Sequence, residues 1–205
     1  MLSFELLIER CTFRGNRCEL GDNNTSGGGM HLSSGYATLK NCLIYDNYST
    51  YGGGGIYKFA PSPANTGILT LVNCTIASNV APSSSAIYFR RFDSMHMCNT
   101  VIYSNLVGIS SSYAFYFTNS WIQQRDVTNG VNGEGNITNG LNPAFVDVEG
   151  NNFRLTAGSP CINTGVNQPW TAGAIDLDGR ERVRYGTVDM GAYEYVYEGT
   201  VYMLR

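Results

Sequence analysis

The sequence predicts an all-β protein, a right-handed parallel β-helix of about five to six coils with an irregular C-terminal cap. Three observations support this fold class. The chain has 24 Gly and 14 Tyr but only 14% charged residues, which suits turns and strands better than amphipathic helices. Internal repeats align along the chain. Within each repeat, apolar residues recur at every second position, as in a strand with one buried face.

The repeat is visible when five segments are stacked: IERCTFRGN, LKNCLIYDN, LVNCTIASN, MCNTVIYSN and FTNSWIQQR. A column of small residues contains Cys11, Cys42, Cys74, Thr100 and Ser120. Two residues later, an apolar column contains Phe13, Ile44, Ile76, Ile102 and Ile122. Five and three residues before the small column, each repeat carries a further apolar pair, from Leu6 and Ile8 in the first repeat to Phe115 and Phe117 in the fifth. We expect each residue to lie over its counterpart in the next coil, about 4.8 Å away.

A change in the apolar phase predicts a corner inside each repeat. Residues five and three before the small column share one strand face, whereas the small and apolar columns would lie on the opposite face of a straight strand. The chain must therefore bend. The residues at the bend are Asn41, Asn73, Asn99 and Asn119, with Arg10 in the first repeat. Asn enters the left-handed backbone region at low cost, which predicts a one-residue corner.

A second asparagine column ends the aligned segment at Asn16, Asn47, Asn79 and Asn105. Stacked amides can form hydrogen bonds along such a ladder. The small column predicts a similar stack of buried thiols at Cys11, Cys42 and Cys74. We interpret all of these residues as structural.

Residues 1–125 are predicted to form the coils, and residues 126–205 a final irregular coil and capping segment within one continuous domain. The cap is needed because an open coil end exposes apolar side chains and strand edges. We expect five charged residues to hold it over the last coil through polar contacts: Asp176, Asp178, Asp189, Arg180 and Arg182.

Several strings resemble those of a known group of proteins. They are GGGM at residues 27–30, GGGGI at 52–56, NCTIASN at 73–79, and a C-terminal stretch from residue 133 to 195 that ends in DLDGRERVRYGTVDMGAYEY. Together they resemble the right-handed β-helix repeat proteins of bacterial surfaces, with repeats like those of polymorphic outer-membrane proteins and the closing segment of choice-of-anchor type proteins. The resemblance implies an extracellular or cell-surface protein and no particular reaction.

Composition and terminal sequence limit the partners. The formal charge of -3 and the pI near 5.3 argue against nucleic-acid binding. The opening MLSFELLIER lacks the flanks of a signal peptide, and no membrane span is expected. Because this opening already belongs to a repeat, we expect further coils to precede it. We also expect the exposed strand edges of the first coil to favour end-to-end self-association.

An aromatic stripe is the candidate ligand-binding site. If Ile56, Ile87 and Phe115 point inward, the tyrosines that follow them should face outward. The predicted site contains His31, Tyr57, Tyr88, Tyr116, Arg90 and Arg91. Exposed aromatic rings beside hydrogen-bonding groups suit a glycan or a partner protein, while the alternative is a ladder of rings that stabilises the sheet.

No catalytic residues, cofactor or metal ligands are predicted. The acidic residues do not recur at one repeat position, and the Asp176-Leu177-Asp178-Gly179 string lacks the remaining ligands of a calcium loop. The sequence therefore favours a non-enzymatic surface module that binds glycan or protein. Two alternatives remain: a fragment of a carbohydrate-active enzyme (polysaccharide lyase or glycoside hydrolase), and a structural spacer of a larger surface protein.

Overall fold

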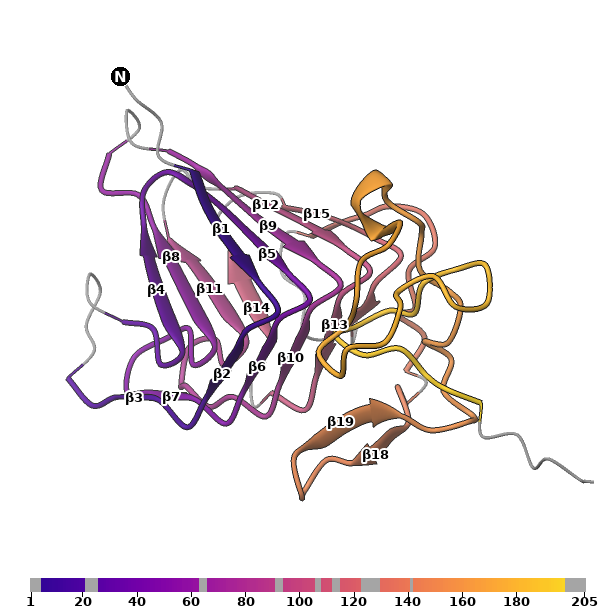
Figure 1. Ribbon diagram of the computed structural model, residues 1–205. Helices are drawn as coiled ribbons and strands as arrows, with labels where there is room; N and C mark the ends of the chain where they lie inside the picture. Colours follow the sequence, from indigo (N-terminus) through magenta and orange to yellow (C-terminus); the bar gives the residue numbers. More distant parts are fainter. Residues whose placement is uncertain are drawn as a thin grey trace, which may run out of the picture.

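The computed structural model describes residues 5–20, 26–62, 66–90, 94–105, 108–111, 115–122, 130–140 and 142–197. These residues form an all-β structure of mainly parallel strands stacked in sheets, with one antiparallel pair near the C-terminus (Figure 1). The only helix among them is a short 3-10 helix, η3, at Pro169–Thr171. From β1 to β16 the chain visits three sheets in the same cyclic order, which is compatible with a parallel β-helix.

The first sheet has the order β1 (Glu5–Glu9), β5 (Tyr36–Lys40), β9 (Ile68–Val72), β12 (Ser94–Cys98), β15 (Phe115–Thr118) and β17 (Gly130–Asn132). The second contains β16 (Trp121–Ile122), β13 (Val101–Tyr103), β10 (Thr75–Ala77), β6 (Leu43–Tyr45) and β2 (Thr12–Arg14). The third contains β14 (Ile109–Ser111), β11 (Ile87–Arg90), β8 (Ile56–Phe59) and β4 (Met30–Ser33). Two small sheets pair β3 (Arg17–Cys18) with β7 (Tyr48–Ser49), and β18 (Phe145–Asp147) with β19 (Asn152–Leu155).

The strand register confirms the predicted columns. In the second sheet, Ile76 pairs with Ile44 on one side and with Ile102 on the other, and the column ends at Phe13 and Ile122. In the first sheet, Leu39 and Leu71 pair with each other. The inward-facing residues of all three sheets form one apolar core, because every strand presents alternate residues to the interior.

The predicted corners are also confirmed. Positive φ angles between 44° and 53° occur at Arg10, Asn41, Asn73, Asn99 and Asn119. A second set of corners, which the sequence analysis did not predict, lies one residue before the second asparagine column, at Gly15, Asp46, Ser78 and Ser104. Both corners turn the chain between sheets with a single left-handed residue.

The amide ladder exists as predicted. Asn16 Nδ2 donates to Asn47 Oδ1 at 3.0 Å, Asn47 Nδ2 donates to Asn79 Oδ1 at 2.9 Å, and Asn79 Nδ2 donates to Asn105 Oδ1 at 3.1 Å. Each acceptor oxygen also receives the backbone N–H of the preceding asparagine in the ladder. The amides of the ladder, of which Asn47, Asn79 and Asn105 are buried, therefore satisfy one another along the coils.

The thiol column follows the same stacking. Backbone hydrogen bonds join Leu43 to Cys11 and Thr75 to Cys42, which places the three cysteines in register. Cys42 and Cys74 are buried and Cys11 is half-buried, and all three are free thiols. Burial raises the pKa of the Cys74 thiol well above its usual value, so this residue is protonated at neutral pH.

The C-terminal part lies in a different place from the one predicted. Residues 130–137 extend the first two sheets. β17 pairs with β15 in the first sheet, and Ile137 forms a bridge with Trp121 of the second. Residues 142–197, which we call the closing segment, lie beside the corners between the first and second sheets rather than over the last coil (Figure 1). The expected location was wrong because the outer face of the second sheet is apolar and needs a cover.

The closing segment and the second sheet share a second apolar core. Outward-facing Leu43, Ala77, Val101 and Trp121 pack with apolar residues of the closing segment, including Phe145, Phe153, Leu155, Met190 and Tyr193. Corner asparagines bind the same segment through its carbonyl groups. Asn41 Nδ2 donates to Ile175 O at 3.0 Å, and Asn73 Nδ2 donates to Asp189 O at 3.0 Å.

Candidate functional site

The predicted aromatic stripe is divided between two sheets. His31, Tyr57 and Tyr88 form one row in the third sheet through direct register pairs. Tyr116 does not continue this row. It lies in the first sheet and pairs with His96, because β14 supplies the next strand of the third sheet before the chain reaches Tyr116. The expectation of one continuous stripe was therefore wrong.

The row in the third sheet is only partly accessible, since His31 is exposed and Tyr88 is half-buried. Ile56 and Ile87 point into the core as expected, but Tyr57 is fully buried instead of exposed. Its ring centroid lies 5.2 Å from that of His31 and 5.5 Å from that of Tyr88. These ring contacts are the ones expected from the alternative interpretation, in which stacked rings stabilise the sheet.

The two described basic residues near this row, Lys58 and Arg90, are differently placed. Arg90 lies over the Phe59 ring, 5.7 Å from its centroid, and Lys58 is fully buried in register between Leu32 and Phe89. Arg91 lies outside the described residues. The third sheet therefore brings His31, Tyr57 and Tyr88 together, but Tyr116 lies in another sheet.

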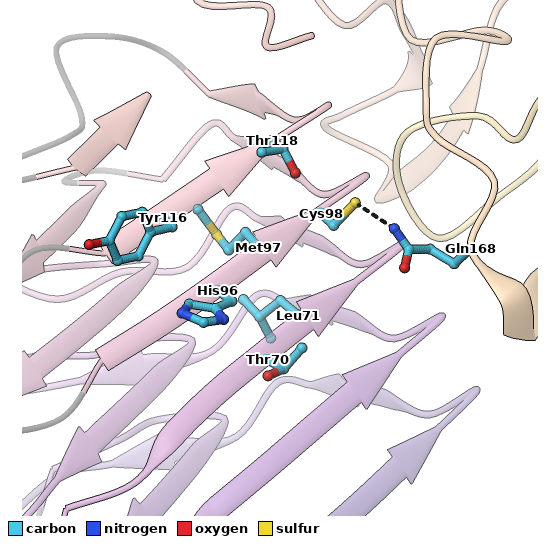
Figure 2. A pocket seen from close by; sticks show the side chains of 8 residues that line it. All are labelled: Thr70, Leu71, His96, Met97, Cys98, Tyr116, Thr118 and Gln168. Atoms are coloured by element: carbon cyan, nitrogen blue, oxygen red, sulfur yellow. Dashed lines mark hydrogen bonds between the residues drawn. The ribbon is translucent and has the colours of Figure 1, made fainter. Parts of the chain in front are cut away.

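A pocket of about 250 Å³ lies instead on the outer face of the first sheet (Figure 2). It is lined by residues of β9, β12 and β15 and by one residue of the closing segment. The lining residues are Thr70, Leu71, His96, Met97, Cys98, Tyr116, Thr118 and Gln168. We call this feature the sheet pocket.

Strand alternation explains the floor of the sheet pocket. The register aligns Thr70, His96 and Tyr116 in one outward-facing row, and Cys98 and Thr118 lie in the next outward-facing row. The intervening Leu71 and Met97 are buried in the core. The same alternation that fills the interior with apolar side chains therefore presents hydroxyl, imidazole, phenol and thiol groups outside.

The closing segment supplies the wall of the sheet pocket. Gln168 Nε2 donates to Cys98 Sγ at 3.4 Å, as Figure 2 shows. The segment is positioned by Asn99, whose Oδ1 accepts the Val166 N–H at 2.8 Å while its Nδ2 donates to Val166 O at 2.9 Å. A corner asparagine of the coils thus holds the wall of the pocket in place.

The sheet pocket combines polar and apolar side chains. The His96 and Tyr116 rings meet edge to face, with centroids 5.6 Å apart, and Tyr116 is 52% exposed. Burial raises the pKa of the Cys98 thiol, which makes it a weak nucleophile at neutral pH. The eight described lining residues include neither a carboxylate nor a Lys or Arg side chain. Such a pocket can bind a ring through stacking and hydrogen bonds.

A buried charged network lies outside the sheet pocket, within the closing segment. Arg182 Nη2 lies 3.1 Å from Glu194 Oε1, and it also donates to the carbonyl of Asp189 at 3.0 Å. Asp176 and Asp189 are buried beside this pair. The predicted polar contacts of the closing segment therefore exist, but Glu194, which the sequence analysis did not name, is the ion-pair partner of Arg182.

The Asp176–Gly179 loop uses its first carboxylate for the turn itself. Asp176 Oδ1 accepts the N–H groups of Asp178 and Arg180, each at 2.8 Å. Arg154 pairs with Asp178 at 2.6 Å, which lowers the pKa of that carboxyl group. Across the part of the chain that the structure describes, no group of three potential metal ligands is close enough to hold an ion.

Sequence reasoning identified only Tyr116 of the sheet pocket as a site residue. Stacking the five repeats places His96 level with Tyr116, so this pair could have been found from the columns. Gln168 could not, because its contact with Cys98 spans 70 residues of the chain.

Comparison with known proteins adds no assignment: no protein-family model matches this chain, nor does any curated protein or solved structure. Within the described ranges, no helix is long and apolar enough to cross a membrane.

Proposed function

We propose that this chain is a right-handed parallel β-helix module of an exported, cell-surface protein, and that it binds glycan at the sheet pocket. The cyclic order of the three sheets and the stacked columns support the β-helix. The resemblance of the repeats to bacterial surface proteins supports the location. The observation that carries the binding function is the joint lining of one pocket by Tyr116, His96 and Gln168.

Each lining group suits a saccharide. Tyr116 presents an exposed aromatic ring, which packs against the apolar face of a sugar at low entropic cost. His96, Gln168 and Thr118 offer donors and acceptors for hydroxyl groups. The eight lining residues lack the carboxylate pair that acid and base catalysis would use, so the pocket gives no specific support to the lyase or hydrolase alternative.

A glycan array followed by calorimetric titration tests the proposal. We expect saturable binding without turnover, and a loss of affinity of about ten-fold in His96→Ala and in Gln168→Ala. Tyr36→Ala is the matched control, because Tyr36 is 45% exposed on the first sheet but does not line the pocket. Cleavage of a polysaccharide would support the enzyme alternative, and absence of both binding and cleavage would support the spacer.

A further inference from the structure

We infer that the sheet pocket selects an uncharged sugar ring over an acidic one. This inference rests on the proposed function and goes beyond it by naming the ligand class. The charges around the pocket, its size and its polar groups all favour a neutral ring.

The charges around the sheet pocket disfavour an acidic sugar. A sugar carboxylate that leaves water needs an Arg or Lys partner to offset its desolvation. The eight lining residues that the structure describes supply none. Among the described residues, Lys40 of the same sheet is already engaged: its Nζ lies 3.2 Å from Glu9 Oε1 and 5.2 Å from the centroid of the Trp170 ring. With a formal charge of -3, the chain as a whole also repels anions.

The sheet pocket is small. A volume of about 250 Å³ is below the range of about 300–1,000 Å³ that is typical for drug-sized ligands. It suits one ring or the end of a chain. A protein partner would need about 800 Å² of contact surface, far more than this pocket provides. The sheet pocket therefore favours a single sugar unit over a peptide or a folded domain.

The polar side chains of the sheet pocket match the hydroxyl groups of a sugar. Thr70 and Thr118 carry hydroxyls, Gln168 carries an amide, and His96 carries an imidazole. These groups both donate and accept, as sugar hydroxyls do, so one ring can satisfy them without a net charge. The exposed ring of Tyr116 supplies the apolar contact.

Matched probes provide the test: oligosaccharides in pairs, in which each neutral hexose of one member is the corresponding uronic acid in the other. We expect the neutral member to bind about ten-fold more tightly by calorimetry at neutral pH. We also expect Tyr116→Ala to weaken neutral binding about ten-fold, while Tyr36→Ala leaves it unchanged. If Tyr116→Ala fails to fold by circular dichroism, Thr118→Val replaces it, since it removes a lining hydroxyl at constant shape.

A charge-introducing variant separates selectivity from binding. Thr70→Lys places a cation on the pocket floor, and we expect it to improve binding of the acidic probes about ten-fold. Tighter binding of acidic than of neutral probes by the natural protein would overturn the inference and leave glycan binding intact. Equal affinity for both members of each pair would overturn it in the same way. Failure of all saccharides to bind would overturn the proposed function itself.

Discussion

Arg182 and Glu194 form a buried ion pair, with Nη2 and Oε1 3.1 Å apart and both side chains at most 2% exposed. Two further buried carboxylates, Asp176 and Asp189, share the surroundings of this single guanidinium. Buried carboxyl groups therefore outnumber the guanidinium, which favours protonation of one of them. Arg182 also donates to Asp189 O, the carbonyl that accepts from Asn73 Nδ2 at a corner, so the pair is linked to the contact between the closing segment and the coils.

Removing the guanidinium should destabilise the protein strongly. We expect Arg182→Met to lower the free energy of unfolding by about 3–5 kcal/mol, because it leaves buried carboxylates without a counter-charge. Urea denaturation followed by circular dichroism measures this. Arg184→Met is the control, since Arg184 is exposed and should change stability by less than about 0.5 kcal/mol. Similar losses in both variants would contradict the role of the buried pair.

The same network predicts a pH dependence. Burial raises the pKa of Glu194 from 4.5 to about 8, although Arg182 acts in the opposite direction. The folded state therefore keeps a proton that the unfolded state has lost, and stability falls as pH rises from about 4.5 to about 8. The slope should approach about 1.4 kcal/mol per pH unit. Burial also raises the pKa of Asp189, with the same sign.

The comparison of natural protein with Glu194→Gln isolates this effect. The amide keeps an acceptor for the Asp189 N–H, which lies 3.0 Å from Glu194 Oε1, but it cannot titrate. We expect the curve of unfolding free energy against pH to be flatter between pH 5 and 8 in the variant. Parallel curves would show that Glu194 does not hold the proton.

The corner asparagines allow a test of backbone conformation. Asn73 has a φ of 50° and its Nδ2 donates to Asp189 O, so it turns the chain and also holds the closing segment. Both Asn73→Gly and Asn73→Ala remove the hydrogen bond, but only Gly adopts the left-handed region without cost. We expect Asn73→Ala to be less stable than Asn73→Gly by about 1–2 kcal/mol in urea denaturation. Equal stabilities would argue against the strained corner.

The cysteines should remain thiols. Titration in denaturant without reductant is expected to count all six, which are free in the structure. In the native protein, Cys74 and Cys161 should react only on unfolding, because both are buried and burial raises the pKa of Cys161 to about 12. A count below six would indicate a disulfide among them.

Much of the coil architecture could be predicted because it is encoded locally. The apolar residues of each strand recur in every repeat, and asparagine recurs at the first corner and at the end of four of the five repeats, so like residues meet like residues. The aromatic site was less predictable. Tyr57 and Tyr116 have the same local pattern, an aromatic residue after an inward apolar one, yet one is buried in the third sheet and the other exposed in the first.

The amino-acid sequence by itself determined which residues stack, where the chain turns and which strand faces are apolar, because period and repeat are properties of neighbouring residues. Only the tertiary structure decided that the closing segment covers the outer face of the second sheet, that Arg182 meets Glu194, and that Gln168 forms a wall opposite Tyr116. The physical reason is that these contacts depend on how a non-repetitive segment packs against the finished coils, and no periodic pattern records that packing.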